Sequence, residues 1–98
     1  MPYDLPLSQA LRQAGWKVKI HDLERLEPPH VTIYCKRRKW RLSLRNGGFL
    51  DLGDKSSQID RRVRTAVNDA WQRLQQEWDR IHPANPVRGP DDDDRNDQ

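Results

Sequence analysis

Apolar and polar residues alternate with a period of two in three runs of the chain, at residues 16–21, 31–36 and 39–45. The first run shows the pattern most clearly, with apolar Trp16, Val18 and Ile20 separated by Lys17, Lys19 and His21. An alternation of this kind predicts a β-strand with one buried face and one exposed face. The three runs therefore predict three antiparallel strands that share an apolar face.

A basic segment joins the second run to the third, so these two runs predict a β-hairpin. With residues 37 and 38 as a two-residue turn, the strands pair Cys35 with Trp40, Ile33 with Leu42 and Val31 with Leu44. All six apolar residues then face one side of the sheet, so register and pattern agree. Arginine does not favour the positive φ of a tight hairpin turn, and a bulged or longer turn is the alternative.

Two stretches with helical spacing flank the predicted strands. Ser8 can cap a short helix that extends to about residue 14, and Gly15 suits the left-handed position that follows a helix. From about residue 58 to 81, apolar residues recur at three- and four-residue steps, which predicts a long amphipathic helix. Ser57 and Asp60 at its start resemble a capping box.

These elements predict an α+β fold with a short N-terminal helix, a three- to four-stranded antiparallel sheet and a long C-terminal helix packed on one sheet face. The fourth strand would be residues 49–52, which follow a strong Asn-Gly-Gly turn signal. Packing the helix on the sheet covers both apolar surfaces. The predicted domain spans residues 1–83, and residues 84–98 are expected to form a disordered acidic tail.

Charge is distributed unevenly along the 98 residues. Residues 1–90 contain 17 Lys and Arg against 10 Asp and Glu, and residues 91–98 contain one Arg against five Asp. The predicted domain is thus more basic than the net charge of +3 for the whole chain suggests. A basic domain attracts phosphate polymers, and other anionic surfaces as well.

The outward face of the predicted sheet carries much of this positive charge. It would display six cations and no acidic residue, through Lys17, Lys19, His21, Thr32, Tyr34, Lys36, Lys39, Arg41, Ser43 and Arg45. Arg37 and Arg38 in the turn extend the same surface, and Tyr34 could stack on an unpaired base. Solubility and edge protection are the alternative explanation for Lys and Arg on such strands.

Arg61, Arg62 and Arg64 lie in the first turns of the predicted long helix. Cations at this end of a helix oppose the helix dipole. One interpretation is that the helix N-terminus and these arginines together form an anion site. Ordinary surface arginines, partly offset by Asp60, are the alternative. Arg61 and Arg62 therefore join the sheet and turn residues in the predicted nucleic-acid-binding set.

His30 follows two prolines and is the candidate for catalysis, as a general acid or base in phosphodiester chemistry. A histidine held by a hydrogen bond at the start of a strand is the alternative. The three histidines match no zinc spacing, and no metal or other cofactor is expected. Cys35 is predicted to face the core as an inert thiol, and the four Trp residues all fall on apolar faces.

A single cysteine excludes an internal disulfide and fits a reducing compartment. No apolar run approaches the roughly 18–20 residues of a membrane span, and the N-terminus lacks the basic-then-apolar pattern of a signal peptide. The expected location is the cytoplasm, without a membrane partner.

Residues 27–34, Glu-Pro-Pro-His-Val-Thr-Ile-Tyr, resemble the E-P-P-H-V-H-V hallmark of a family of small bacterial proteins of unknown function. In that family the segment leads into a strand, a basic hairpin and a C-terminal helix with an EAW-like ending, to which Glu77 and Trp78 correspond here. Thr32 stands where the family has its second histidine. The resemblance covers residues 15–82 loosely and implies a toxin–antitoxin-like context with a small partner protein.

The predicted order of helix, three strands and helix is also similar to that of a double-stranded-RNA-binding domain. Two functions are therefore expected. The first is a small basic toxin-like protein that binds RNA or another anionic polymer through the cationic sheet face. The second is a non-catalytic interaction module that docks a protein partner on that face, or forms a homodimer through a sheet edge. A small acidic partner protein is the partner expected in the toxin–antitoxin case. The sequence identifies no reaction.

Overall fold

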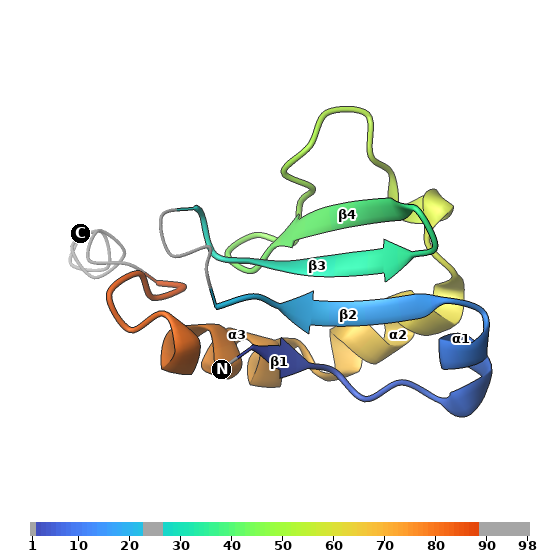
Figure 1. Ribbon diagram of the computed structural model, residues 1–98. Coiled ribbons are helices and arrows are strands. Elements are labelled where there is room, and N and C mark those ends of the chain that lie inside the picture. The colour runs from blue at the N-terminus through green and yellow to red at the C-terminus, as the bar shows by residue number, and fades with distance from the viewer. Residues whose placement is uncertain (1, 23–26, 89–98) are drawn as a thin grey trace.

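The computed structural model describes residues 2–22 and 27–88, and the elements named here belong to those residues. In chain order they are β1 (Tyr3–Asp4), α1 (Gln9–Gln13), β2 (Trp16–Ile20), β3 (His30–Cys35), β4 (Arg38–Ser43), the 3-10 helix η1 (Ser56–Gln58), α2 (Arg61–Asp69) and α3 (Trp71–Ile81). The strands form one antiparallel sheet in the order β1-β2-β3-β4, and α2 and α3 lie against one of its faces (Figure 1). The prediction of an α+β fold with an antiparallel sheet is confirmed.

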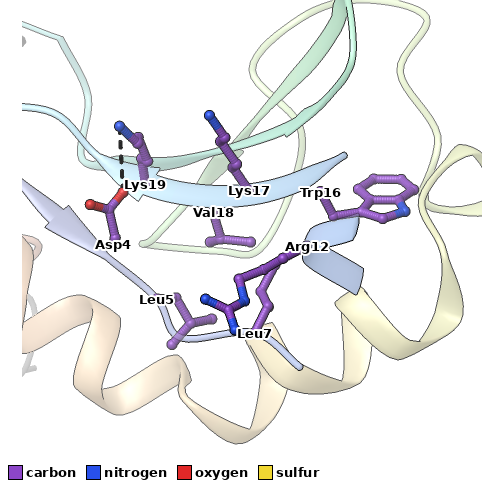
Figure 2. A pocket seen from close by; sticks show the side chains of 8 residues that line it. All are labelled: Asp4, Leu5, Leu7, Arg12, Trp16, Lys17, Val18 and Lys19. Carbon is purple, nitrogen blue, oxygen red and sulfur yellow. Dashed lines mark ion pairs between the residues drawn. The ribbon is translucent and has the colours of Figure 1, made fainter. Parts of the chain in front are cut away.

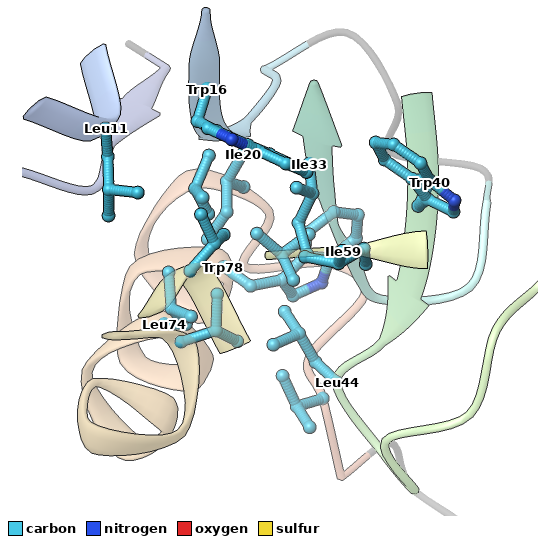
Figure 3. Packing of buried hydrophobic residues seen from close by; sticks show 14 residues of the cluster. Leu11, Trp16, Ile20, Ile33, Trp40, Leu44, Ile59, Leu74 and Trp78 are labelled. Carbon is cyan, nitrogen blue, oxygen red and sulfur yellow. The ribbon is translucent and has the colours of Figure 1, made fainter. Parts of the chain in front are cut away.

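The core lies between the sheet and the two C-terminal helices. The helices contribute four side chains at steps of four and seven residues, each at most 2% exposed: Val63, Val67, Leu74 and Trp78. The strands contribute the apolar residues of their alternation, and Figure 3 shows Trp16, Ile20, Ile33 and Trp40 in the same cluster as Leu74 and Trp78. The Trp16 and Trp40 rings stack at a centroid distance of 5.7 Å. The apolar alternation therefore predicts the buried face of the strands correctly.

The N-terminal helix forms where the sequence predicts it. Ser8 caps α1, because its Oγ accepts a hydrogen bond from the backbone N–H of Leu11 at 3.4 Å. Gly15 follows the helix with a φ of 96°, in the left-handed conformation that favours glycine. This turn leads the chain directly into β2 at Trp16.

The β3–β4 hairpin is offset by two residues from the predicted register. Ile33 pairs with Trp40 instead of Leu42, so the turn consists of Lys36 and Arg37. Lys36 adopts a φ of 58°, and it is the only non-glycine residue in the described ranges with a positive φ. A shift of two residues leaves every side chain on its predicted face. The alternation thus predicts the face of each residue. The register of β3 with β4 follows from the position of the turn at Lys36 and Arg37.

The fourth strand is not the one that the sequence predicts. It is β1, in the N-terminal segment, where Tyr3 pairs with Ile20 of β2. The predicted strand at residues 49–52 is reduced to a single bridge between Phe49 and Leu42, after which the chain bends away. A strand of two residues has no alternation that the sequence could reveal.

The predicted helix over residues 58–81 is divided into α2 and α3. Asp60 caps α2 in place of Ser57, and its Oδ1 accepts from the backbone N–H of Arg62 at 2.8 Å. Ala70 separates the two helices with φ −102° and ψ 13°, although Leu74 N still donates to the Ala70 carbonyl at 2.8 Å. Alanine is the best helix former, so the residue type gives no signal for this bend. Within residues 2–22 and 27–88, no helix is long and apolar enough to cross a membrane.

Residues 84–88 pack on the domain, whereas the sequence predicts that an unstructured tail begins at residue 84. Val87 is only 5% exposed, and its backbone N–H donates to Asp79 Oδ1 at 2.7 Å. The carbonyl of Asn85 accepts from Trp78 Nε1 at 2.7 Å, and the carbonyl of Val87 accepts from Arg45 Nε at 2.6 Å. The packed chain therefore extends to residue 88, and the rest of the predicted tail lies outside the described residues.

Candidate nucleic-acid interface

The outward face of β2 and β3 forms an open groove that is bordered by positive side chains. The groove has a volume of about 260 Å³ and is lined by Gly15, Lys17, Lys19, His21, Tyr34 and Lys36. We call it the cationic groove. The sheet register builds it, because Lys17 on β2 pairs with Tyr34 on β3 and outward positions of neighbouring strands lie side by side.

An aromatic pair forms part of the groove wall. Tyr34 Oη and His21 Nε2 are 2.7 Å apart, within hydrogen-bond distance, and the two rings meet edge to face with centroids 5.9 Å apart. Both side chains are half-buried. Lys17 and Lys39 are the cross-strand neighbours of Tyr34 on its two sides. An aromatic ring held between cations is the arrangement on which proteins stack an unpaired base.

The lysines of the groove differ in how far their charge is compensated. Lys17 and Lys36 are exposed, and neither forms an ion pair within the described residues. Lys19 Nζ lies 3.5 Å from Asp4 Oδ1, and Figure 2 shows this pair beside Lys17 on the outward side of β2. The same view shows Val18 on the inward side, which is the predicted alternation. Among the described residues, the groove therefore presents two cations without an ion-pair partner and a third that shares a carboxylate.

Gly15 keeps one end of the groove open. A Cβ atom at this position would lie 3.2 Å from Lys36 Cγ, and the positive φ of Gly15 would strain any other residue. The same glycine that ends α1 therefore leaves space for the aliphatic part of Lys36.

The β3–β4 turn and the first residues of β4 carry further cations beyond the groove. Arg37, Arg38 and Lys39 are exposed, as the sequence predicts. The Arg38 guanidinium lies 4.8 Å from the centroid of a Trp40 ring, a cation–π contact that fixes its position. Lys39 adjoins the groove as the cross-strand neighbour of Tyr34, and Lys36 lies both in the groove and in the turn, whereas Arg38 lies on the side of Trp40.

Arg41 is held by two carboxylates, although the sequence analysis expects no acidic residue on this face. Its Nη2 lies 2.6 Å from Asp51 Oδ1 and its Nη1 lies 2.8 Å from Glu27 Oε1. The hydrogen bond with Asp51, reinforced by the charges of Asp51 and Glu27, raises the pKa of Arg41 against the opposing effect of desolvation. The same bond lowers the pKa of Asp51. Arg41 therefore serves as a link between segments and does not add to the cationic groove.

Arg45 and two polar residues of the predicted face are also engaged in the fold. Arg45 lies just beyond β4 and donates to the carbonyls of Val87 and Pro86, at 2.6 and 3.3 Å. Thr32 and Ser43 are only 2% and 6% exposed, so they are not available to a polymer. The outward face is thus open over Lys17, Tyr34 and Lys36 and closed at its other end.

The arginines of α2 lie apart from the cationic groove, because the helices cover the opposite face of the sheet (Figure 1). Arg62 forms an ion pair with Asp60, whose Oδ2 is 3.0 Å from Nη2. The hydrogen bonds from Arg62 to Asp60 lower the pKa of this carboxylate. Asp60 already occupies the helix N-terminus as its cap, so the predicted anion site there has an internal occupant. Arg61 remains an exposed surface residue.

His30 is buried at the start of β3. The residue is 1% exposed, its Nδ1 lies 2.8 Å from the Pro28 carbonyl oxygen, and its ring packs against Trp78 at a centroid distance of 5.6 Å. A buried ring cannot reach the phosphodiester of a polymer on the surface, so the proposed interface omits His30. Cys35 is half-buried against the core, as the sequence predicts. In the described residues, no group of three or more His, Cys, Asp or Glu side chains could hold a metal ion.

The contact of Arg41 with Asp51 and Glu27 is not predictable from the sequence pattern. These residues are separated by 10 and 14 positions in the chain, and no local pattern links them. No protein-family model, no curated protein and no solved structure matches the chain. The inference of a function therefore rests on the geometry and charge of the surface.

Proposed function

We propose that this protein binds single-stranded RNA through the cationic groove and the adjoining turn. The observation that carries the proposal is the position of Tyr34, held by His21 and flanked by Lys17 and Lys39. The lysines attract phosphates and release condensed counterions, while the tyrosine ring offers a stacking surface to a base. This pairing of charge with a fixed aromatic ring favours RNA over a purely electrostatic ligand.

Two observations favour an unpaired strand over a duplex. The groove is a local feature of two strands, about 260 Å³ in volume, and it can accommodate a splayed base beside its phosphate. A double-stranded-RNA-binding domain contacts phosphates with the N-terminal end of its last helix, but here Asp60 caps α2 and pairs with Arg62. Arg61 and Arg62 are therefore left out of the proposed interface.

The experiment that tests the proposal measures the affinity for a fluorescently labelled single-stranded RNA at increasing salt concentration. The logarithm of the association constant should fall linearly with the logarithm of salt, with a slope of about 0.7 for each phosphate contacted. Binding should persist with a phosphate polymer without bases but be weaker, because the Tyr34 stacking contribution is then lost. Absence of binding to RNA at low salt would refute the proposal.

A toxin–antitoxin-type pair is the biological context that we propose for this RNA binding. A small acidic partner protein would neutralise Lys17, Lys36 and the turn arginines, and so compete directly with RNA for one surface. Competition between the purified partner and labelled RNA tests this directly. The reduced thiol of Cys35 fits a cytoplasmic location in this context.

A further inference from the structure

A second cavity lies on the other side of the sheet from the cationic groove, in the crevice between β4 and α2. It has a volume of about 230 Å³ and is lined by Ile33, Leu42, Gly47, Phe49, Ser56, Ile59, Arg64, Val67 and Asn68. Five of these side chains are apolar, and they come from four separate segments of the chain. We call this space the helix crevice.

The helix crevice reaches the core from the surface, because exposed Gly47, Ser56 and Asn68 line it together with buried residues. Ile33, Ile59 and Val67 in its lining are at most 3% exposed, while Leu42 and Phe49 at its mouth are half-buried. The half-buried residues pack against the core cluster but still present apolar surface to the opening. Walls of this kind bury the hydrocarbon part of a small ligand.

The crevice continues along the seam between β4 and the helices. A neighbouring depression of about 430 Å³ shares Leu42, Gly47 and Asn68 with it and is lined further by Trp71, Arg45 and Asn46. An elongated ligand could therefore occupy both cavities, one after the other along the boundary between β4 and the helices. Its apolar portion would run from Ile33 and Val67 toward the Trp71 ring.

Arg64 gives the crevice its chemical specificity. Its Nε is buried and has no hydrogen-bond acceptor, and the side chain forms no ion pair within the described residues. A buried donor without an acceptor is destabilising, and a guanidinium is matched best by the two oxygens of a carboxylate. The nearby carboxylate of Asp60 is engaged by Arg62, so it does not supply these oxygens.

We propose that the helix crevice binds a small carboxylic acid with an unbranched apolar chain. The carboxylate pairs with the guanidinium of Arg64, and the chain lies on Leu42, Phe49 and Val67. This binding needs no covalent step and does not depend on the RNA interface on the opposite sheet face. A free monocarboxylic acid is the ligand class that fits both the charge and the apolar walls.

The test titrates the full chain with butyrate, hexanoate and octanoate and follows methyl NMR signals. The signals of Ile33, Leu42, Ile59 and Val67 should shift, and each added methylene that is buried should tighten binding roughly fourfold. Octanol should bind at least about tenfold more weakly than octanoate, because a charge-assisted contact to Arg64 is lost. Shifts confined to methyl groups that do not line the crevice, such as those of Val18 and Leu74, or no shifts at millimolar octanoate, would overturn the proposal.

Two variants separate the carboxylate contact from general loss of charge or fold. Arg64→Gln should bind octanoate about tenfold more weakly and no longer prefer it to octanol, whereas Arg61→Gln removes the same charge from the same helix and should bind as the wild type does. Asn68→Trp, at an exposed position where the two cavities meet, should block binding with the melting temperature preserved. Equal octanoate affinity in Arg64→Gln and Arg61→Gln would overturn the role of Arg64.

Discussion

The hydroxyl oxygen of Tyr34 lies 2.7 Å from Nε2 of His21, across 13 positions of sequence. This contact ties the C-terminal end of β3 to the residue that follows β2. It holds a half-buried aromatic ring beside two exposed lysines, Lys17 and Lys39. The ring is therefore preorganised for stacking, and a ligand need not immobilise it on binding.

The Tyr34 side chain should contribute to RNA affinity through its ring more than through its hydroxyl. Tyr34→Ala removes the stacking surface and should weaken binding to single-stranded RNA by about 1–3 kcal/mol. Tyr34→Phe keeps the ring and should stay close to wild type in the same fluorescence titration. Equal losses in the two variants would show that the hydroxyl, and not stacking, carries the interaction.

Arg41 should matter for stability and not for RNA binding. Arg41→Gln leaves Glu27 and Asp51 without their shared partner, on side chains that are 41% exposed. Because the cluster is half-exposed, the free energy of unfolding should fall by about 1–2 kcal/mol in urea denaturation. Lys39→Gln, at the exposed position two residues earlier, should show little change in stability. A weaker RNA affinity of folded Arg41→Gln would contradict the assignment.

Acid should destabilise the protein partly through Glu77. Burial acts to raise the pKa of Glu77, but hydrogen bonds from Arg80 and Arg73 outweigh it and hold the pKa below its usual value. A lowered folded-state pKa means that the stabilisation is complete above the unfolded value of about 4.3 and is lost as pH falls through the folded value. In Glu77→Gln, stability should be lower at pH 7 and should decline less between pH 5 and 2.

The control for this pH dependence is Asp69→Asn, which removes an exposed carboxylate that has no ion pair within the described residues. Its pH profile should run parallel to that of the wild type in urea denaturation. A Glu77→Gln profile that also runs parallel to the wild type would show that the Arg73–Glu77–Arg80 cluster does not contribute to acid sensitivity.

The segment after α3 should be part of the stable domain. A chain that ends at residue 83 loses buried Val87 and the carbonyls that accept from Trp78 and Arg45. Its free energy of unfolding should fall by at least about 2 kcal/mol. A chain that ends at Arg88 should unfold at the same urea concentration as the full chain. If both shortened chains match the full chain, the contacts of residues 84–88 are not stabilising.

The fold was predictable where it depends on periodicity. Alternation in Trp16–Ile20 and in β3 and β4 predicts the strands and their buried faces, and Ser8 and Gly15 predict the ends of the first helix. Pairing between distant segments leaves no such signal. The two-residue strand β1, the register set by Lys36 and the bend at Ala70 all depend on tertiary packing, which overrides local preference.

The candidate site was predictable in part, for the same reason. The strand period places Lys17, Lys19, Tyr34, Lys36 and Lys39 on one outward face, and the structure brings the first four of these together in one groove. Period alone cannot show which cations have partners. Arg41, Arg45 and Arg62 belong to the predicted set, yet each has a partner within the protein. Arg41 pairs with Asp51 and Arg45 donates to the Val87 carbonyl, both distant in the chain, and Arg62 pairs with Asp60, the cap of its own helix.

The most direct test of the cationic groove compares two double variants that remove the same charge. In Lys17→Gln/Lys36→Gln, the salt dependence of RNA binding should become shallower by about 1.4 in slope, since two phosphate contacts are lost. Arg61→Gln/Arg62→Gln, on the helix side of the sheet, should keep the wild-type slope and nearly the wild-type affinity. A wild-type slope in the groove variant, or an equal loss in the helix variant, would contradict RNA binding at the cationic groove.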